Sequence, residues 1–484
     1  MNKPLRRIAI FCGLLVLALL VRVNWLQYVR AGELNANEHN RRVQIERYAH
    51  ERGNIIVDGN PVTGSVETEG TDFKYKRVWK NGPLWSPVTG YSSQAFGASQ
   101  LESIEDGILT GNSDQLFFDR TLSLFAGDQK KGGNIVTTLN GAAQKAAFEG
   151  LGNKKGSVVA LDPKTGAILA LVSTPSYDPS VFAGNSFKDE KARKTLLDDK
   201  NKPMINRALR ETYPPGSTFK VVTAAAALEN GLYTDIDART NSPLPWQLPQ
   251  STKPLNNEGN IPCENASLRE ALRWSCNTVF GKISDDLRNQ KMIDQANKFG
   301  FNQEIFTPVR ADASVYPKDN RPQNAMAGIG QASNRATPLQ MAMVAAAVAN
   351  DGKLMQPYMV AQRQAPSLDV IYTHKPEQFS QPLSAGNAQK LQQMMETVVQ
   401  DGTGKNAQIP GVTVGGKTGT AQHGLNNSEK PYAWFLSYAK THDGSPVAVA
   451  VVVEDSEASR GDISGGGLAA PIAKAVMKAV IDKR

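Results

Sequence analysis

Gly415-Gly416-Lys417-Thr418-Gly419-Thr420 is compatible with two different folds. Counted from Gly411, the spacing Gly-x4-Gly-Lys-Thr satisfies the consensus of a phosphate-binding P-loop, which joins a strand of a parallel α/β sheet to a helix. The same residues also suit one strand of an antiparallel sheet. The flanking sequence decides between the two folds.

The sequence after Lys417 lacks the pattern of a helix. Gly419 and Pro431 interrupt it, and two apolar runs follow, 433–439 and 447–453, which are separated by the turn sequence Thr-His-Asp-Gly. This pattern predicts a β-hairpin, and adjacent antiparallel strands do not form a nucleotide site. We therefore interpret the Lys417 stretch as a strand, whose paired glycines would let a substrate approach the backbone.

The region that begins near Asn134 alternates strands with helices. The expected elements are a strand at 135–139, a helix at 141–151, a hairpin at 156–172, a helix from Pro338 to Asn350 with Thr337 as its N-cap, and a helix at 469–481. Hairpins at both ends of the region, with helices between them, predict an α+β fold in which helices pack on one antiparallel sheet.

The composition is that of a globular protein, with 40% apolar and 21% charged residues. A length of 484 residues allows two or three domains. The net charge of +8 fits a nearby anionic membrane or cell-wall polymer, and equally a solvated basic surface. We expect no nucleic acid partner, because no dense Lys/Arg tract is interleaved with aromatic residues. The five histidines are scattered, so no metal site is expected.

The N-terminus predicts a membrane anchor. A basic segment precedes the uncharged, mostly apolar run 8–21, and Arg22 can snorkel so that the usable span reaches Tyr28. No small-x-small cleavage site follows, so we interpret 8–28 as a retained signal anchor and not as a cleaved signal peptide. The basic flank predicts a cytoplasmic tail at 1–7 and an extracytoplasmic location for the rest of the chain.

Residues 29–132 are predicted to form a stalk and a small β-rich pedestal domain. The polar stretch 30–47 suits a helical or extended stalk. Residues 52–59 predict a strand that runs into an Asp-Gly turn. No catalytic cluster is found here, so the chemistry is expected in the last domain, 133–484.

The cysteines leave one question open. Cys12 lies in the anchor, and Cys263 and Cys276 are the only pair outside it. A disulfide between them is plausible outside the cell, and two buried free thiols are an equal alternative, because the sequence does not place their Cα atoms.

Ser217-Thr218-Phe219-Lys220 introduces the first candidate chemistry. Two prolines and Gly216 precede it, which predicts a loop, followed by a helix from Ser217 to Gly231 that is apolar nearly all round and therefore buried. Free N–H groups at a helix N-terminus favour developing negative charge on Ser217. Lys220 lies on the same face as Ser217, and an apolar setting would let its amine act as a base. Alternatively, Ser217 could be an ordinary helix N-cap and Lys220 a solvated surface lysine. The helix that follows is too apolar for a surface helix, which argues against this alternative.

Ser275-Cys276-Asn277 lies between a short helix, 268–274, and another that starts at Thr278. Ser-x-Asn at such a junction is most often only a helix cap. A hydroxyl and an amide on one loop can also relay a proton and hold a substrate amide.

Ser-x-x-Lys, Ser-x-Asn and Lys-Thr-Gly occur in this order, and together they resemble the motifs of the penicillin-binding proteins, the acyl-serine superfamily that includes the serine β-lactamases. Further stretches resemble class B, the monofunctional transpeptidases, and within it the PbpA type of actinobacteria. These stretches are Arg52-Gly53-Asn54-Ile55, Gly328-Ile329-Gly330-Gln331, Thr337-Pro338-Leu339-Gln340 and Gly402-Thr403-Gly404. The resemblance covers nearly the whole chain, with a departure at Ala332, where many relatives have glycine.

The resemblance implies the catalytic residues of a peptidoglycan D,D-transpeptidase. Ser217 would attack the carbonyl between the last two D-alanines of a stem peptide, and Lys220 would take its proton. Ser275 would pass a proton to the leaving amine and link Lys220 to Lys417. An amine of a second stem would then resolve the acyl-enzyme.

The resemblance also implies the substrate-binding residues. Asn277 would orient the donor's side-chain amide, and Thr418 and Thr420, on the same strand as Gly419, would bind the terminal carboxylate. The backbone N–H groups of Ser217 and Thr420 would form the oxyanion hole.

The family implies β-lactams as inhibitors, no cofactor, and a polytopic glycan polymerase of the SEDS type as a partner at the membrane. Two other functions stay open. One is a hydrolase, either a D,D-carboxypeptidase or a β-lactamase, since class D β-lactamases share the sequence Ser-Thr-Phe-Lys. The other is a β-lactam sensor or scaffold that no longer crosslinks. A bifunctional glycosyltransferase is excluded, because the region before residue 134 is too short for that domain.

Overall fold

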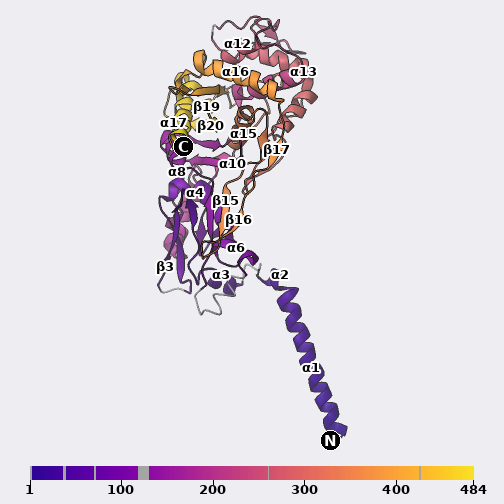
Figure 1. The fold of residues 1–484 in the computed structure, drawn as a ribbon, viewed down its shortest axis with the longest axis vertical. Coiled ribbons are helices and arrows are strands. Elements are labelled where there is room, and N and C mark those ends of the chain that lie inside the picture. The colour runs from indigo at the N-terminus through magenta and orange to yellow at the C-terminus, as the bar shows by residue number, and fades with distance from the viewer. Residues whose placement is uncertain are drawn as a thin grey trace.

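The structure is a computed structural model that describes residues 3–35, 40–69, 72–117, 130–259, 261–424 and 427–483. The molecule is elongated, and the helix α1 (Lys3–Tyr28) extends from one end (Figure 1). No residue of α1 is buried, and this helix of 26 residues is long and apolar enough to cross a bilayer. The short helices α2 (Ala31–Asn35) and α3 (Arg41–Arg47) follow it, as expected for a helical stalk.

Short strands and helices alternate between residues 48 and 117. The predicted turn at Asp58-Gly59 joins β1 (Ile55–Val57) to β2 (Asn60–Pro61) in an antiparallel pair. The other elements are β3 (Thr63–Glu67), β4 (Tyr75–Trp79), α4 (Gly82–Thr89), β5 (Ser92–Ser93), β6 (Gly97–Ala98), α5 (Gln100–Ile104) and α6 (Asp106–Leu109). Within the described residues of the pedestal, the short α-helices α4, α5 and α6 and the 3₁₀ helix η1 (Asp114–Leu116) thus accompany the strands.

The sheet of this unit takes strands from distant parts of the chain. Its order is β16-β15-β7-β1-β2, in which β7 (Asn134–Thr137) lies parallel to β1. The strands β15 (Val360–Gln364) and β16 (Val370–Thr373) complete it and descend beside the N-terminal strands in Figure 1. The sheet therefore crosses the predicted domain boundary at residues 132 and 133.

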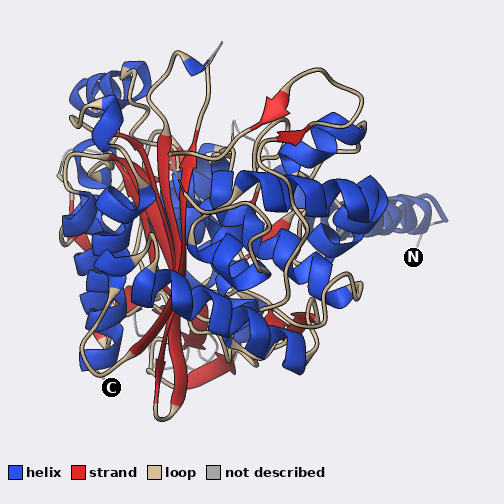
Figure 2. Cartoon of the chain, turned by 90° about the horizontal axis from the view of Figure 1, so that it is seen from above, coloured by secondary structure: helices blue, strands red, loops and turns tan. Residues whose placement is uncertain are grey.

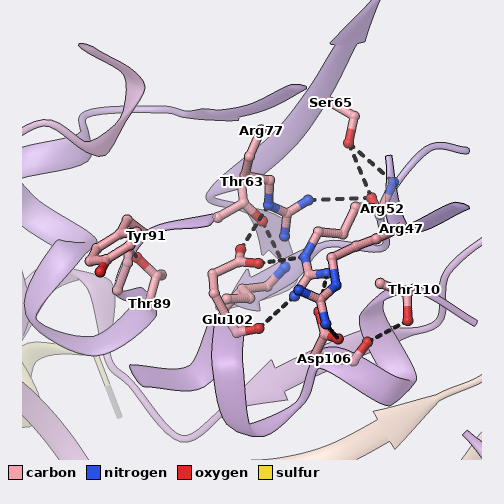
Figure 3. Close-up of polar contacts among 12 residues, drawn as sticks. Arg47, Arg52, Thr63, Ser65, Arg77, Thr89, Tyr91, Glu102, Asp106 and Thr110 are labelled. Atoms are coloured by element: carbon pink, nitrogen blue, oxygen red, sulfur yellow. Dashed lines mark hydrogen bonds and ion pairs between the residues drawn. The ribbon is translucent and has the colours of Figure 1, made fainter. Parts of the chain in front are cut away.

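A buried ion network joins the start of β1 to α5 and α6 (Figure 3). The two oxygens of the Glu102 carboxylate accept hydrogen bonds from Arg52 Nε at 2.5 Å and Arg77 Nε at 2.7 Å. Arg52 also pairs with Asp106 at 2.7 Å. Because Arg52, Arg77 and Glu102 are buried, each charge depends on its partners for solvation.

A second sheet of five antiparallel strands forms the centre of the larger part of the molecule. Its order is β18-β19-β20-β8-β9, and the strands are β8 (Lys155–Leu161), β9 (Ile168–Thr174), β18 (Thr413–Ala421), β19 (Tyr432–Thr441) and β20 (Gly444–Asp455). The two predicted hairpins thus join into one sheet through β20 and β8. Lys417 lies on β18, antiparallel to β19, so the P-loop interpretation is excluded.

Helices cover both faces of this sheet (Figure 2). Along β20, Val449 and Val451 pack in one core cluster with α8 (Gly141–Leu151) and α17 (Ala470–Asp482). The alternate residues Ala450 and Val452 belong to the other core cluster, which includes α15 (Pro338–Ala349). Because successive side chains of a strand point to opposite faces, burial on both faces explains the continuous apolar run.

The other helices of this part are α9 (Phe187–Asp198), α10 (Arg207–Arg210), α11 (Lys220–Glu229), α12 (Leu268–Arg273), α13 (Asn277–Lys298), α14 (Arg321–Ala327) and α16 (Ala385–Asp401). Two-stranded ribbons complete the described structure: β10 (Trp246–Gln247) with β11 (Pro254–Leu255), β12 (Ile305–Phe306) with β13 (Arg310–Ala311), and β14 (Leu354–Met355) with β17 (Gln378–Ser380). The predicted helices α8, α15 and α17 are present, and the Thr337 hydroxyl caps α15 by accepting the N–H of Gln340.

Candidate active site

Ser217 lies in a 3₁₀ turn, η3 (Gly216–Phe219), that leads directly into α11. The predicted start at Ser217 is therefore wrong by three residues, because the entering turn is 3₁₀. The predicted stop at Gly231 is confirmed, because Glu229 is the last α-helical residue and Gly231, with a φ of 66°, follows the C-cap. From Lys220 to Leu228 every residue of α11 is buried, as the apolar sequence predicts.

Backbone contacts from two distant segments hold the Ser217 turn. The N–H of Gly216 donates to the carbonyl of Gly330 at 2.9 Å, and the indole of Trp434 on β19 donates to Pro214 at 3.1 Å. A Cβ at Gly330, where φ is 78°, would lie 2.0 Å from the Gly216 carbonyl oxygen. Only glycine fits so close a backbone approach in this conformation, which explains the Gly-Ile-Gly-Gln stretch.

Lys220 is fully buried and is bonded to the Ser-x-Asn element. Its amine donates to the Ser275 carbonyl at 2.7 Å, the Ser275 hydroxyl at 3.1 Å and Asn277 Oδ1 at 2.6 Å. Burial, with a smaller contribution from the charge of Lys417, lowers the pKa of Lys220 well below its usual range. Burial thus favours the neutral form of the amine, whose lone pair can accept a proton.

Ser275 and Asn277 are fixed at the junction of α12 and α13. Ser275 adopts a φ of 61°, a left-handed backbone conformation that residues other than glycine seldom take. Cys276 forms a disulfide with Cys263, with a Cα–Cα distance of 5.7 Å, which answers the question that the sequence left open. The amide of Asn277 also donates to the Asn256 carbonyl at 3.2 Å, so the segment before α12 packs over the element.

Lys417 is fully buried on β18, and its amine donates to the Thr418 carbonyl at 2.9 Å. Burial lowers the pKa of Lys417 to about 7, against a smaller opposing effect of the Glu258 carboxylate. At neutral pH this lysine is consequently divided between its charged and neutral forms.

The glycines of β18 serve packing. A Cβ at Gly415 would lie 2.3 Å from the ring of Tyr438, and one at Gly416 would lie 2.6 Å from Phe435, so aromatic rings of β19 occupy that space. The expectation that these paired glycines admit substrate is therefore wrong. Gly419 has a similar role, because its Cβ would lie 3.1 Å from the Pro215 carbonyl oxygen, beside the Ser217 turn.

One cleft of about 400 Å³ collects most of the predicted site residues. Ser217, Ser275, Asn277, Thr418 and Thr420 line it, whereas Lys220, Lys417 and Gly419 are buried behind them. Three motifs that lie far apart in the sequence thus meet around one serine.

The cleft also includes residues to which the sequence analysis assigned no role. The Thr403 hydroxyl lies 2.7 Å from the Thr418 hydroxyl. In the sequence, Thr403 had been singled out only as part of the Gly402-Thr403-Gly404 stretch. The others are Glu258, Ile261, Trp274 and the segment 464–466. Trp274 ends the predicted helix 268–274 directly before Ser275, whereas Glu258, Ile261 and the segment 464–466 belong to no motif or periodic pattern that could have indicated them.

The fold and the site define an acyl-serine enzyme of the penicillin-binding type. The family model described as the penicillin binding protein transpeptidase domain matches residues 156–478, and the penicillin binding protein A dimerisation domain matches 52–135. The chain belongs to the penicillin-binding protein transpeptidase family.

Within this family the chain is similar to proteins named peptidoglycan D,D-transpeptidase PbpA. It is 39% identical to the protein of Mycolicibacterium smegmatis over 495 residues and 40% identical to that of Mycobacterium tuberculosis over 493 residues. Each alignment covers 99% of both chains.

Solved structures of penicillin-binding protein A from M. tuberculosis have the same fold. The ceftriaxone acyl-enzyme complex superposes with a TM-score of 0.85 at 38% identity, over 90% of this chain and 100% of that one. The penicillin G acyl-enzyme complex gives 0.83 at 39% identity, over 89% and 100%.

Proposed function

We propose that this protein is a peptidoglycan D,D-transpeptidase that works through an acyl-enzyme on Ser217. One observation carries the proposal: the buried amine of Lys220, whose pKa is lowered by burial, is bonded to Ser275 and Asn277, which line the same cleft as Ser217. Such an amine serves as a general base beside a serine nucleophile. The relatives named D,D-transpeptidase and the acyl-enzyme complexes of the similar structures support it.

In the first half-reaction the Ser217 oxygen attacks the carbonyl between the last two D-alanines of a donor stem. Lys220 takes the hydroxyl proton, and Ser275 passes a proton to the D-alanine amine as the peptide bond breaks. The N–H groups of Ser217 and Thr420 stabilise the oxyanion, an interaction that typically contributes about 3 kcal/mol. Asn277 orients the donor amide, while Thr418 and Thr420, with charged Lys417, bind the terminal carboxylate.

In the second half-reaction an amine of a neighbouring stem attacks the acyl carbon. The bond between this carbon and Ser217 breaks, the proton of the amine returns to the serine, and a crosslink has formed. β-Lactams imitate the D-Ala-D-Ala end and acylate the same serine.

The location follows from the same proposal. The helix α1 anchors the chain in the cytoplasmic membrane, residues 1–7 remain in the cytoplasm, and the catalytic part lies outside. A glycan polymerase of the SEDS type is the expected partner, contacted through the anchor and pedestal.

Ser217→Ala tests the enzymatic function. Full-length wild-type protein should be labelled covalently by a fluorescent penicillin, and Ser217→Ala should lose the label, because the nucleophile is gone. A wild-type adduct that persists for minutes in intact-mass spectra supports the transpeptidase, while one lost within seconds supports a β-lactamase.

A matched cellular experiment addresses the sensor alternative. In cells that lack the native copy, Ser217→Ala should fail to restore normal crosslinking in isolated peptidoglycan. Restoration to the wild-type level would show that the protein does not act as a crosslinking enzyme.

A further inference from the structure

The cleft contains one described residue with a negative charge, Glu258. It follows β11 on the segment that packs over the Ser-x-Asn element, and its side chain is exposed. Among the described residues its carboxylate takes part in no hydrogen bond or ion pair, although it lines the same cleft as Ser217. A carboxylate in this position is free to bind a cation.

The other charged groups near the cleft are two lysines, and they are much less accessible than the Glu258 carboxylate. Lys220 and Lys417 are fully buried behind the lining residues, and burial disfavours the charged form of each amine by lowering its pKa. Glu258 is therefore the one exposed charged side chain among the described residues that line the cleft, although its carboxylate and the Lys417 amine attract each other.

The proposed transpeptidation needs two substrates, and their reacting ends carry opposite charges. The donor ends in a carboxylate, which an exposed glutamate repels. The acceptor brings a primary amine, which is protonated near neutral pH because alkyl amines have a pKa of about 10.4. Of the two, only the acceptor gains from Glu258.

We propose that Glu258 binds the protonated amine of the acceptor stem peptide and thereby selects amines over water as the group that resolves the acyl-enzyme. This inference rests on the proposed function. Glu258 holds the ammonium close to the Ser217 ester and forms and breaks no covalent bond. Before the nitrogen attacks, the ammonium gives one proton to the amine of Lys220, which acylation has left unprotonated, and the second proton goes to Ser217 as the ester bond breaks.

The test separates the two half-reactions in the full-length protein. A stem-type peptide that ends in D-Ala-D-Ala and has its own amines blocked is the donor, and a dipeptide with a free primary amine is the acceptor. The acylation rate, the amide product and the hydrolysis product are measured for wild type and Glu258→Gln. We expect the variant to raise the acceptor KM about two- to fivefold, as for an exposed ion pair, with a much smaller change in acylation.

An uncharged acceptor gives a readout that a merely structural change would not produce. The same dipeptide with a hydroxyl in place of the amine should lose no more than twofold in the variant. Glu258→Asp should restore part of the preference for the amine, and Glu258→Lys should weaken amine transfer further than Gln. Glu264→Gln, an exposed carboxylate on the same segment outside the cleft, is the matched control and should behave as wild type.

Three outcomes would overturn the inference. Equal losses with amine and hydroxyl acceptors would indicate a structural role. Slower hydrolysis with unchanged amine transfer would indicate that Glu258 activates water instead. An unchanged acceptor KM would show that it does not contact the amine. By contrast, failure of the wild-type protein to form any amide would refute the proposed function itself.

Discussion

At the scale of single residues, burial gives the two active-site lysines their chemistry. Lys220 and Lys417 are both fully enclosed, yet they differ in their partners: Lys220 is held by the Ser-x-Asn element, and Lys417 by its own strand. The pKa of Lys220 lies well below its usual range, and that of Lys417 lies at about 7. One lysine is thus suited to accept a proton, and the other to carry a charge that depends on pH.

This difference predicts the pH dependence of acylation. The second-order rate constant for a β-lactam that has a carboxylate should fall above about pH 7, because Lys417 becomes neutral and no longer attracts the carboxylate. It should also fall once the pH drops below the lowered pKa of Lys220, because the amine is then protonated and no longer accepts the serine proton. Lys417→Ala should lower the rate constant at pH 6 at least tenfold and flatten the alkaline limb, as measured by stopped-flow acylation from pH 5 to 9.

Spontaneous hydrolysis of the β-lactam at each pH is the necessary control. An alkaline limb that persists unchanged in Lys417→Ala would mean that another group controls it.

At the scale of elements, the reactive serine depends on close packing between segments that lie far apart in the sequence. The turn η3 is held by the carbonyl of Gly330 and by Trp434, and Gly419 on β18 approaches it from the other side. Ala332, the departure from the family pattern, adopts a left-handed φ of 55°, which explains why glycine suits that position.

Gly330→Ala should therefore displace the Ser217 turn. Its Cβ would lie 2.0 Å from the Gly216 carbonyl oxygen at a left-handed φ, so we expect a loss of at least about 2 kcal/mol in stability and a strong loss of penicillin labelling. Gly386→Ala on α16 is the matched control, because nothing lies within 4 Å of its Cβ. Thermal melting and labelling of both variants check this, and wild-type labelling of Gly330→Ala would contradict it.

At the scale of the whole molecule, the sheet of the pedestal is built from segments that lie far apart in the chain. The sheet includes β1 and β2 from the N-terminal part and β15 and β16 from residues beyond 359. The buried network in which Arg52 and Arg77 donate to Glu102 lies inside this unit.

Glu102→Ala should destabilise this unit strongly. The substitution leaves Arg77 buried without its carboxylate partner and deprives Arg52 of one of two, a change that typically costs about 3–5 kcal/mol. Asp198→Asn, which removes the exposed pair with Lys194, should change stability by less than about 1 kcal/mol. Urea unfolding of both variants gives the comparison, and equal midpoints would contradict it.

The antiparallel hairpins, the buried helix after Ser217 and the order of the three motifs could all be predicted from the sequence. These depend on local patterns: alternation along a strand, apolar periodicity along a helix, and turn residues between them. The resemblance of the motifs then named all eight predicted site residues, of which five line the cleft and three lie behind it.

Only the tertiary structure decided what surrounds Ser217. It showed that aromatic rings fill the space beside Gly415 and Gly416, that Cys276 is bonded to Cys263, and that Glu258 is part of the cleft. The physical reason is the same in each case. Contacts between distant segments leave no periodic signal in the sequence, because they arise from how the elements pack and not from how each element forms.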